Sequence, residues 1–578
     1  MKKSFKNIAL CYFIFMFFCI IINFILFFKL YISKNVPFNL AITPFDIAEK
    51  YPIVWKNIKY AYIIVAFIAY TIIFKSTIFK FLSKFQTQKN IKQNNISEEK
   101  FKLKIGTNKN GELVNIEEQG LYQNIIVTGT IGSGKTSSAM YPFTKQIMSY
   151  KSNNFNEKIA MLILDVKGNY YKKVEEFAKE LNREEDVIKI DLTSRIKYNP
   201  LDKPNLKPIV LANRLKTILL LFNQNNSESY WLDKAEQVLT ECIKFCRMYN
   251  DEYVDFSELH KLVMFEDYYK SKVEVVREKF LKGELSTSNE YELLSCMNFF
   301  QKEFFSLDSR TLSILKSEIS RITNIFVSDY NVSKTFCPPK NEINFEGFDE
   351  VLDKGKIVVL NMNISEYKNL SKIIAAYLKL DFQTTVMNRL SNNKRLRKSC
   401  FISDEYHEYV TNTDSDFFAQ SREAKCINIV ATQSYTSLLN TIKDESTVKV
   451  IIQSLVNKIW FRTDDMFTIE EAQKLVGKEE KQKSSVTISE NAKETNYNFF
   501  VDAFVSRDSS ISESYNKFTQ TDYIYDTNFF TQELKTFSSL CFLSTGFKIL
   551  KPQELDMIPY FKDEKRENNN YLKGFEVK

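Results

Sequence analysis

The sequence predicts an α/β domain that is interrupted by an all-helical insertion and preceded by two membrane-spanning helices. Short apolar runs alternate with helical patterns in the first and last thirds of the main body, which is typical of parallel βαβ units. The stretch between Pro208 and Pro338 contains no proline and one glycine, Gly283, and therefore favours helices. An uncharged apolar run from Ile8 to Phe28 is long enough to cross about 30 Å of hydrocarbon as a helix.

The N-terminal residues predict a membrane hairpin. The run Ile8–Phe28 is too long for a signal peptide, and no small-residue cleavage site follows it. A second apolar run, Tyr60–Phe74, reaches the length of a span when Lys56 and Lys59 extend toward the interface. Lysines precede the first run and follow the second, and the loop between them is nearly balanced in charge. The positive-inside rule then predicts a two-pass protein of the inner (cytoplasmic) membrane, with both termini and the main body in the cytoplasm.

The main body divides by composition. Strand-like runs occur at 122–128, 160–166, 187–191, 356–363, 399–405, 427–433, 457–463 and 539–545. Between the third and fourth of these runs, apolar residues recur at helical spacing, and the polar segment 478–530 has the alternation of a hairpin. The predicted organisation is a membrane hairpin (1–80), a linker (81–100), one α/β domain in two segments (101–207 and 338–560), an all-α insertion (208–337) and a tail that we expect to be mobile (561–578).

Composition argues against some classes of function. The formal net charge of +8 is modest for 578 residues, so it permits contact with nucleic acid or anionic lipid without indicating either. The chain has nine cysteines but only two histidines, His260 and His407. Because a zinc site would need more ligands than these, Cys242 and Cys246, which share a helical face, are better interpreted as core residues.

The stretch "GTIGSGKT", Gly129 to Thr136, fits the phosphate-binding pattern G-x-x-x-x-G-K-[ST], which is called the P-loop. It follows a strand-like run and begins a helical one, and this context makes an accidental turn the weaker interpretation. Glycines let backbone N–H groups surround a phosphate, Lys135 would reach the β- and γ-phosphates, and the Thr136 hydroxyl would bind Mg²⁺. The residues predicted to bind ATP are Gly129, Thr130, Gly132, Ser133, Gly134, Lys135, Thr136 and Ser137.

A P-loop ATPase also needs a carboxylate at the tip of a neighbouring strand. The run "CFISDEYHEY" ends a strand in Asp404 and Glu405. Asp404 would hold Mg²⁺ through water, and Glu405 would orient or deprotonate the attacking water. The alternative is a strand that merely ends in an acidic turn, and the P-loop upstream favours the catalytic interpretation.

Two further residues are candidates for transition-state contacts. The strand "INIVATQ" ends in Thr432 and Gln433, and a polar residue beside the acidic strand can sense the γ-phosphate. Arg422, in "AQSREAKC", could act as an arginine finger across a subunit boundary. From chemistry alone, an ordinary surface arginine remains an open alternative for Arg422.

Together these motifs resemble the type IV secretion coupling proteins, the TraG/TraD-like conjugative DNA-transfer ATPases. The shared features are the two spans, "GTIGSGKT", "DVKG" (165–168), "YNPL" (198–201), the helical insertion, "FISDEYHEY" and "SREAKCINIVATQS" (421–434). The spans and the P-loop are generic, but the ordered set is specific and covers most of the chain. The chain departs from the family at Val166 and Asn169, where the family usually has proline and glutamate.

The resemblance implies a RecA-like ATP hydrolase, a homo-hexameric motor at the base of a type IV secretion channel. Its implied partners are single- or double-stranded DNA bound non-specifically, relaxase and other relaxosome proteins, channel components and the membrane. In the family an arginine at the position of Arg422 is the proposed finger, and the helical insertion would recognise the substrate. The residues that keep the roles given above are Lys135, Thr136, Asp404, Glu405 and Gln433.

Other interpretations remain. An FtsK-type DNA pump shares the P-loop and the acidic pair but is not expected to carry the helical insertion. A nucleotide-binding membrane receptor for secretion substrates could dispense with Glu405 and Arg422. The chain has no LSGGQ-like run, which argues against an ABC transporter. The basic stretch "NRLSNNKRLRK" (388–398) precedes the strand of Asp404, so it lies at the sheet end away from ATP, either as a solvated loop or facing a pore.

Overall fold

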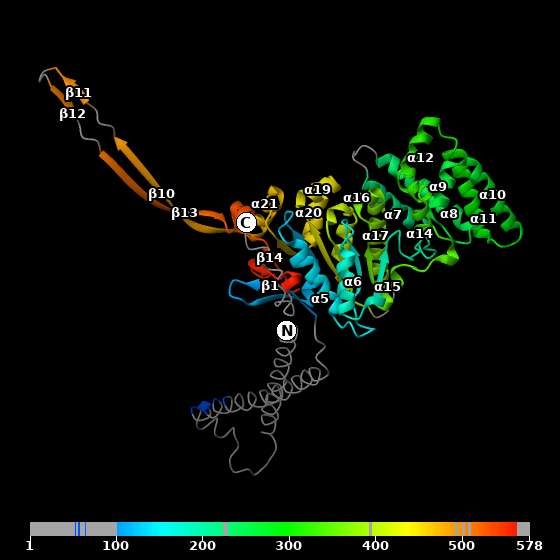
Figure 1. Ribbon diagram of the computed structural model, residues 1–578, viewed down its shortest axis with the longest axis horizontal. Coiled ribbons are helices and arrows are strands. Elements are labelled where there is room, and N and C mark those ends of the chain that lie inside the picture. Colours follow the sequence, from blue (N-terminus) through cyan, green and yellow to red (C-terminus); the bar gives the residue numbers. More distant parts are fainter. Residues whose placement is uncertain are drawn as a thin grey trace, which may run out of the picture. The chain divides into compact units, whose positions relative to one another are not determined.

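The computed structural model describes residues 101–222, 229–391, 396–491, 495–499, 503–506 and 510–562, with single positions at 53, 56, 57, 60 and 64 (Figure 1). The chain divides into two units, Met1–Lys100 and Phe101–Lys578, and the second contains the elements described below. The first predicted span, the linker and nearly all of the second span and the tail lie outside the described residues. Within the part that the structure describes, no helix combines the length and apolar character needed to cross a bilayer.

The second unit is built on an 11-stranded sheet in the order β2-β1-β15-β14-β9-β3-β8-β7-β4-β6-β5. The strands from β9 to β5 pair in parallel, so their C-terminal ends meet at one edge of the sheet. The bounds are β1 (Lys102–Asn108), β2 (Leu113–Glu117), β3 (Ile125–Thr128), β4 (Ala160–Leu164), β5 (Val187–Ile190), β6 (Ile357–Leu360), β7 (Ser399–Ser403), β8 (Cys426–Thr432), β9 (Asn457–Trp460), β14 (Ser538–Phe542) and β15 (Gln553–Met557).

Both faces of the parallel strands are covered by helices. Successive residues of β3 alternate between two cores: Ile125 and Val127 belong to one, and Ile126 belongs to the other. The first core includes buried residues of α5 (Tyr141–Ser149) and α6 (Tyr170–Glu180). The second includes α15 (Phe348–Lys354), α17 (Asn369–Ser391), α18 (Asp414–Gln420), α19 (Tyr435–Ile442) and α20 (Glu445–Ser454). The predicted α/β class is confirmed, and burial on both faces explains why these strands are continuous apolar runs.

Every predicted strand run contains a strand, but the last one differs in direction. The alternation of strands and helices predicts parallel pairing, whereas β14 pairs antiparallel with β9. The sheet then continues antiparallel through β15, β1 and β2. Between β9 and β14 the chain passes through α21 (Met466–Val476) and a hairpin, and it returns so that β14 runs opposite to β9.

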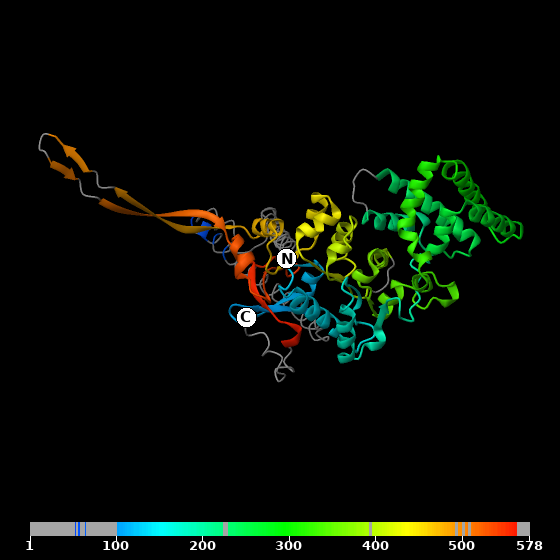
Figure 2. The same ribbon diagram turned by 45° about the horizontal axis from the view of Figure 1, so that its top comes forward.

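The segment between β5 and β6 forms the expected helical insertion (green in Figures 1 and 2). Its core contains the buried aromatic rings of Phe245, Tyr269 and Phe300, which lie 4.6–6.2 Å apart between centroids. Asp255 and Asp308 cap two of its helices by accepting backbone N–H groups. The helices are α7 (Pro208–Leu220), α8 (Ser229–Tyr249), α9 (Phe256–Met264), α10 (Glu266–Leu281), α11 (Thr287–Asn298), α12 (Ser309–Thr323), α13 (Ile325–Ser328) and α14 (Tyr330–Phe336).

The hairpin expected over 478–530 is present as a two-stranded ribbon. β10 (Lys478–Asn491) pairs antiparallel with β13 (Ser510–Tyr523), and β11 (Thr495–Asn498) pairs with β12 (Ala503–Ser506). The ribbon begins directly after α21, and Lys481 Nζ ties its base by donating to the carbonyl oxygens of Tyr523 and Ile524 at 2.7 and 3.0 Å.

Candidate functional site

The P-loop connects β3 to a π-helical turn, Thr136–Met140, that continues into α5. Gly132 and Gly134 have φ angles of 77° and 102°, which L-residues rarely adopt. A Cβ on Gly134 would lie 2.6 Å from the ring of Phe537, and one on Gly129 would lie 2.6 Å from Phe461. A Cβ on Gly132 would meet nothing within 4 Å. Backbone geometry therefore accounts for Gly132 and Gly134, and close packing accounts for Gly129 and Gly134.

The side chains of the P-loop converge on its interior. Lys135 is buried, and its Nζ donates to the carbonyl oxygens of Gly129 and, at 3.1 Å, Thr130. Burial lowers the pKa of Lys135, while the charges of Glu405 and Asp404 oppose that shift. Thr136 Oγ1 donates to Asp404 Oδ2 at 3.0 Å. The two predicted metal ligands are thus in direct contact although 268 positions separate them in the sequence.

The acidic pair directly follows β7. Burial raises the pKa of Asp404 to about 6, and the nearby charges of Asp165 and Glu405 act in the same direction. Glu405 occupies the left-handed region, with φ of 51°, and its backbone N–H donates to Asp404 Oδ1 at 3.1 Å. A buried carboxylate close to other acidic groups and a residue in this backbone region are both costly, and such features gather at functional sites. Asp404 is therefore a group that a bound cation would stabilise.

The strand order corrects one detail of the expectation. Asp404 and Glu405 were expected on a strand neighbouring the P-loop strand, but β8 lies between β3 and β7. Thr136 reaches Asp404 across the end of β8 because the P-loop and the turn after β7 both project beyond the sheet edge. The strand that precedes Gln433, β8, was expected beside the strand that precedes Asp404. This expectation is confirmed, because β8 pairs with β7 in parallel.

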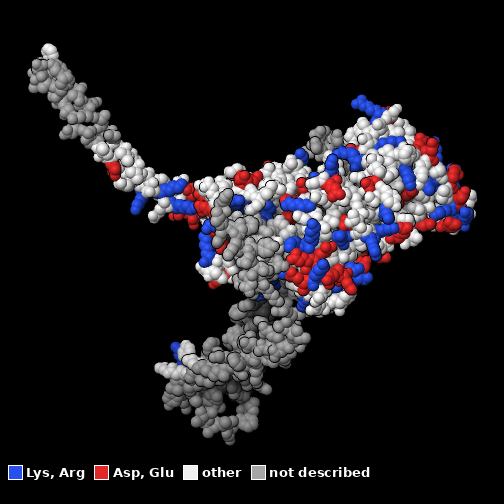
Figure 3. All heavy atoms as spheres, in the orientation of Figure 1, with Lys and Arg blue, Asp and Glu red and all other residues white. Residues whose placement is uncertain are grey.

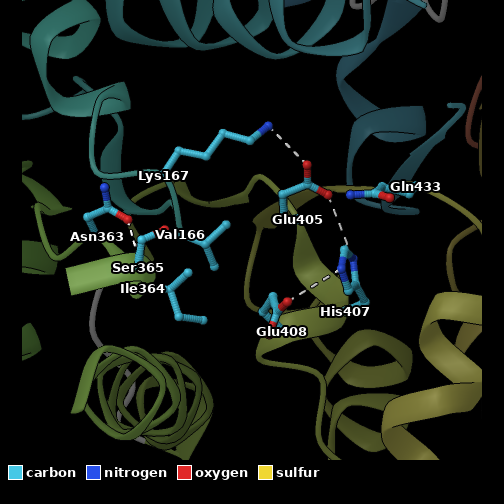
Figure 4. Close-up of a pocket in the computed structure, with 9 residues that line it drawn as sticks. All are labelled: Val166, Lys167, Asn363, Ile364, Ser365, Glu405, His407, Glu408 and Gln433. Atoms are coloured by element: carbon cyan, nitrogen blue, oxygen red, sulfur yellow. Dashed lines mark hydrogen bonds and ion pairs between the residues drawn. The ribbon is translucent and has the colours of Figure 1, made fainter. Parts of the chain in front are cut away.

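A cavity of about 300 Å³ opens beside the acidic pair (Figure 4). Its walls come from the C-terminal ends of β4, β6, β7 and β8. Figure 4 shows Lys167 on one side of Glu405, and Gln433 and His407 on the other. The lining residues are Val166, Lys167, Asn363, Ile364, Ser365, Glu405, His407, Glu408 and Gln433. The structure thus brings Gln433 to the acidic pair, as the sequence predicted.

Seven of the nine lining residues were not predicted as site residues, among them Lys167, His407 and Asn363. Lys167 Nζ lies 3.0 Å from Glu405 Oε1. The Nδ1 atom of His407 lies 3.3 Å from Thr432 Oγ1 and 3.8 Å from Glu405 Oε2. Asn363 packs against Gly168, whose Cβ would lie 3.0 Å from Asn363. The "DVKG" motif was the one sequence signal for Lys167, and it carried no role by itself.

Electrostatics links Lys167 to the acidic pair. Burial alone would raise the pKa of Glu405, but the hydrogen bond and charge of Lys167 outweigh it and lower that pKa. For Lys167, burial lowers the pKa, while Asp404 and Glu405 outweigh it and raise the pKa. Glu405 is therefore ionised at neutral pH, as a proton acceptor must be.

Arg422 is not brought to the other site residues. It precedes β8, at the sheet edge opposite the P-loop, where its side chain is exposed and lies 3.4 Å from the Gly546 carbonyl oxygen. Buried polar contacts anchor this turn: Asn428 Nδ2 donates to Ser421 Oγ at 2.9 Å and to Asn124 Oδ1 at 2.7 Å. These contacts fix the turn that carries Arg422, but at the sheet edge opposite the P-loop.

The three cations of the basic stretch 388–398 that the structure describes are engaged within the chain. Arg389 lies 2.6 Å from Asp353 Oδ1, and Arg397 donates to backbone carbonyl oxygens, including that of Lys158 at 2.9 Å. Lys398 lies 3.0 Å from Glu118 Oε2. Residues 392–395 lie outside the described part of the chain. These contacts favour a structural role for the described cations over a free basic surface.

Comparison with known proteins agrees with the resemblance drawn from the motifs. Residues 343–507 match the family model described as the type IV secretion-system coupling protein DNA-binding domain. The bacterial conjugative coupling protein TrwBdeltaN70, in its unbound monoclinic form, matches with a TM-score of 0.52 and 10% identity over 79% of this chain and 88% of that one. No curated protein gives a significant match.

Two nucleotide complexes of plasmid coupling protein TrwB have the same fold. The complex with the non-hydrolysable GTP analogue GDPNP gives a TM-score of 0.52 at 9% identity, over 79% of this chain and 89% of that one. The complex with ADP and Mg²⁺ gives 0.50 at 11% identity, over 76% and 86%. At such identities the likeness concerns the fold. Together with the family model, it confirms that the chain resembles the type IV secretion coupling proteins.

Proposed function

We propose that this chain is a membrane-anchored ATPase that couples relaxase-bound DNA, protein substrates or both to a type IV secretion channel and energises their transfer. The observation that carries the proposal is the contact of Thr136 with Asp404, with Lys135 and Glu405 beside it, at the edge where parallel strands end. Ligands bind outside the carboxyl ends of the strands in open α/β sheets. The family match and the TrwB-like fold supply the transfer context.

ATP and Mg²⁺ fit the residues present. The loop has two glycines at positive φ and a third whose Cβ would clash, as close backbone approach to a phosphate requires. Mg²⁺ in nucleotide sites takes one or two protein oxygens along with phosphates and water, which suits Thr136 and Asp404. The solved TrwB complexes contain GDPNP, or ADP and Mg²⁺. When bound, Mg²⁺ would neutralise phosphate charge and orient the terminal phosphate.

The remaining residues have distinct roles in hydrolysis. Lys135 would leave its carbonyl partners to contact the terminal phosphates and neutralise developing negative charge. Glu405, ionised at neutral pH, would orient the attacking water and accept its proton at a carboxylate oxygen. Gln433, across the cavity from Lys167, would donate a hydrogen bond to the γ-phosphate or the water.

Arg422 supports a ring of identical subunits. Because it lies on the edge opposite its own P-loop and is exposed, it reaches a nucleotide only on a neighbouring subunit. An arginine supplied in trans stabilises transition-state charge in related phosphoryl transfers. We therefore propose a homo-hexamer in which each site is completed by Arg422 of the next subunit.

The membrane anchor, location and partners are also part of the proposal. The runs Ile8–Phe28 and Tyr60–Phe74, with their flanking lysines, support a two-pass anchor in the inner membrane with a cytoplasmic body. On the face shown in Figure 3, acidic and basic side chains of the described residues are interspersed rather than gathered in a basic band. DNA contact is therefore better sought inside the proposed ring than on that face, while the helical insertion would recognise relaxase and other substrate proteins.

Transfer assays separate this function from a passive receptor. Lys135→Ala and Glu405→Gln, each introduced into the full-length chain in its host element, should abolish DNA transfer while the protein remains in the membrane. Lys172→Met, which changes an exposed lysine on α6, is the matched control and should transfer normally. Full transfer by either site variant would favour a nucleotide-binding receptor. The helical insertion disfavours an FtsK-type pump, and transfer without a relaxase would restore that candidate.

A further inference from the structure

The carboxylate of Glu405 is held by a single hydrogen bond. Its Oε1 accepts from Lys167 Nζ at 3.0 Å. Its Oε2 is buried and has no hydrogen-bond partner among the described residues. The Nδ1 atom of His407, 3.8 Å from Oε2, is too distant to donate. The direction of this carboxylate therefore depends on Lys167.

The backbone around Lys167 is fixed, although half of its side chain is exposed. Its N–H donates to Asp165 Oδ1 at 3.0 Å, and Asp165 Oδ2 accepts two further backbone N–H groups from the same turn. Gly168 has φ of 66° and lies against Asn363 so closely that a Cβ would be 3.0 Å away. Because β4 and β7 pair in parallel up to Leu164 and Ser403, this turn stands beside Glu405.

The contact also decides which oxygen of the carboxylate is left without a partner. Figure 4 shows Lys167 reaching Glu405 from the β4 side, with His407 and Gln433 beyond the carboxylate. Since Oε1 is engaged, Oε2 is the carboxylate oxygen without a partner, and it lies buried on the side of His407 and Gln433. A buried, unpartnered acceptor is costly unless a ligand or water uses it.

We propose that Lys167 is a positioning residue, which holds Oε1 of Glu405 so that Oε2 stays unpartnered on the side of His407 and Gln433, where it would accept the proton. This inference rests on the proposed function, because it assigns the orientation of the residue that would accept the proton. Lys167 itself does not contact the reacting atoms. Its ammonium fixes one oxygen and leaves the other free.

The test uses the full-length chain in detergent, with Lys167→Met, Lys167→Arg and the exposed control Lys172→Met. Lys167→Met should lower kcat for ATP about tenfold or more, as expected when a general base loses its alignment. Its KM, and its affinity for a fluorescent non-hydrolysable ATP analogue, should stay within about twofold of wild type, because the substitution removes no contact between the protein and the nucleotide. Lys167→Arg should recover most of kcat, and Lys172→Met should match wild type.

A stability measurement tests the pair without catalysis. Tm values for Lys167→Met, Glu405→Gln and the double variant, measured without nucleotide, should be non-additive because the two side chains interact. Replacing Lys167 with Met in a Glu405→Gln background should therefore change Tm less than in wild type. If Lys167→Met does not fold, Lys167→Gln replaces it in both measurements.

Each contrary result has a defined meaning. A raised KM and weaker analogue binding in Lys167→Met would show that Lys167 binds nucleotide directly and would overturn the positioning role. An unchanged kcat, or additive Tm values, would also overturn it. Wild-type protein without any ATP hydrolysis would overturn the proposed function and this inference with it, whereas a hydrolysing wild type with a normal Lys167→Met overturns the inference alone.

Discussion

A buried ion pair ties the turn after Glu405 to α17. Lys379 and Asp414 have no exposed side-chain surface, and Lys379 Nζ lies 2.6 Å from Asp414 Oδ2. The ammonium also donates to the Tyr409 carbonyl oxygen at 2.7 Å and to Thr411 Oγ1 at 2.9 Å, so all three of its protons are used. Asp414 in turn accepts from the Tyr406 hydroxyl. Replacing Lys379 with Met, which is similar in length, removes the positive charge of this network and leaves the negative charge of Asp414 in place.

The expected magnitude follows from what remains. Removing one partner of a buried ion pair typically costs about 3–5 kcal/mol, because the other charge stays buried without compensation. Asp414 would still accept from Gln383 Nε2 at 3.0 Å, from Thr411 N at 3.1 Å and from Tyr406. These donors place the loss near the lower end, about 3 kcal/mol. For a domain of this size that corresponds to a fall in Tm of about 3 °C or more.

The assay is thermal unfolding of the full-length protein in detergent, followed by tryptophan fluorescence. Lys449→Met is the matched control, because Lys449 forms an exposed pair with Glu445 on α20, and such pairs contribute too little to resolve. The double variant Lys379→Met with Asp414→Asn should have a higher Tm than Lys379→Met alone, because it also removes the buried negative charge of Asp414. A Lys379→Met variant as stable as Lys449→Met would refute the reasoning that this pair fixes the turn.

Three other predictions test separate parts of the structure. Gly134→Ala should weaken ATP-analogue binding at least about tenfold and lower Tm, because its Cβ would clash with an aromatic ring, whereas Gly111→Ala meets open space and bears only the backbone cost of about 1 kcal/mol. Burial raises the pKa of Asp255 to about 6, so ionisation of Asp255 lowers the stability of the fold as pH rises from about 4 through 6. Asp255→Asn should therefore raise the free energy of unfolding by about 2–3 kcal/mol at pH 8 and leave it unchanged below about pH 4, as measured by unfolding at a series of pH values. A difference between variant and wild type that does not depend on pH would contradict this prediction. Mixing Arg422→Ala subunits with Lys135→Ala subunits should restore some ATP hydrolysis, because a mixed interface can hold an intact arginine and an intact P-loop, and inactivity of the co-assembled mixture would rule out action in trans.

Local pattern was enough to predict the nucleotide-binding side of the site. The spacing of the P-loop and the strand ending in Asp404 and Glu405 are short-range signals, and parallel strands bring such ends to one edge. The helical insertion was equally readable, because the absence of proline over more than 120 residues leaves little else. The order of β3, β8 and β7 was not readable, since it depends on pairing between distant segments.

Tertiary contacts decide the features that the sequence did not reveal. Lys167 has no pattern that marks it as the partner of Glu405, 238 positions away. Lys379 lies in a long helix whose charged residues would ordinarily face solvent, yet it is fully buried because Asp414 compensates its charge. The antiparallel strands β14, β15, β1 and β2 join the two ends of the described domain, which no local periodicity can indicate.

The most direct test of the central claim is ATP hydrolysis by the full-length protein in detergent with Mg²⁺ and DNA, compared between wild type and Glu405→Gln. We predict that wild type hydrolyses ATP and that Glu405→Gln is slower by about 10²–10⁴-fold, the typical contribution of a general base, while binding a non-hydrolysable analogue normally. Wild-type protein that binds the analogue but does not hydrolyse ATP, or a Glu405→Gln variant that hydrolyses at the wild-type rate, would contradict the account.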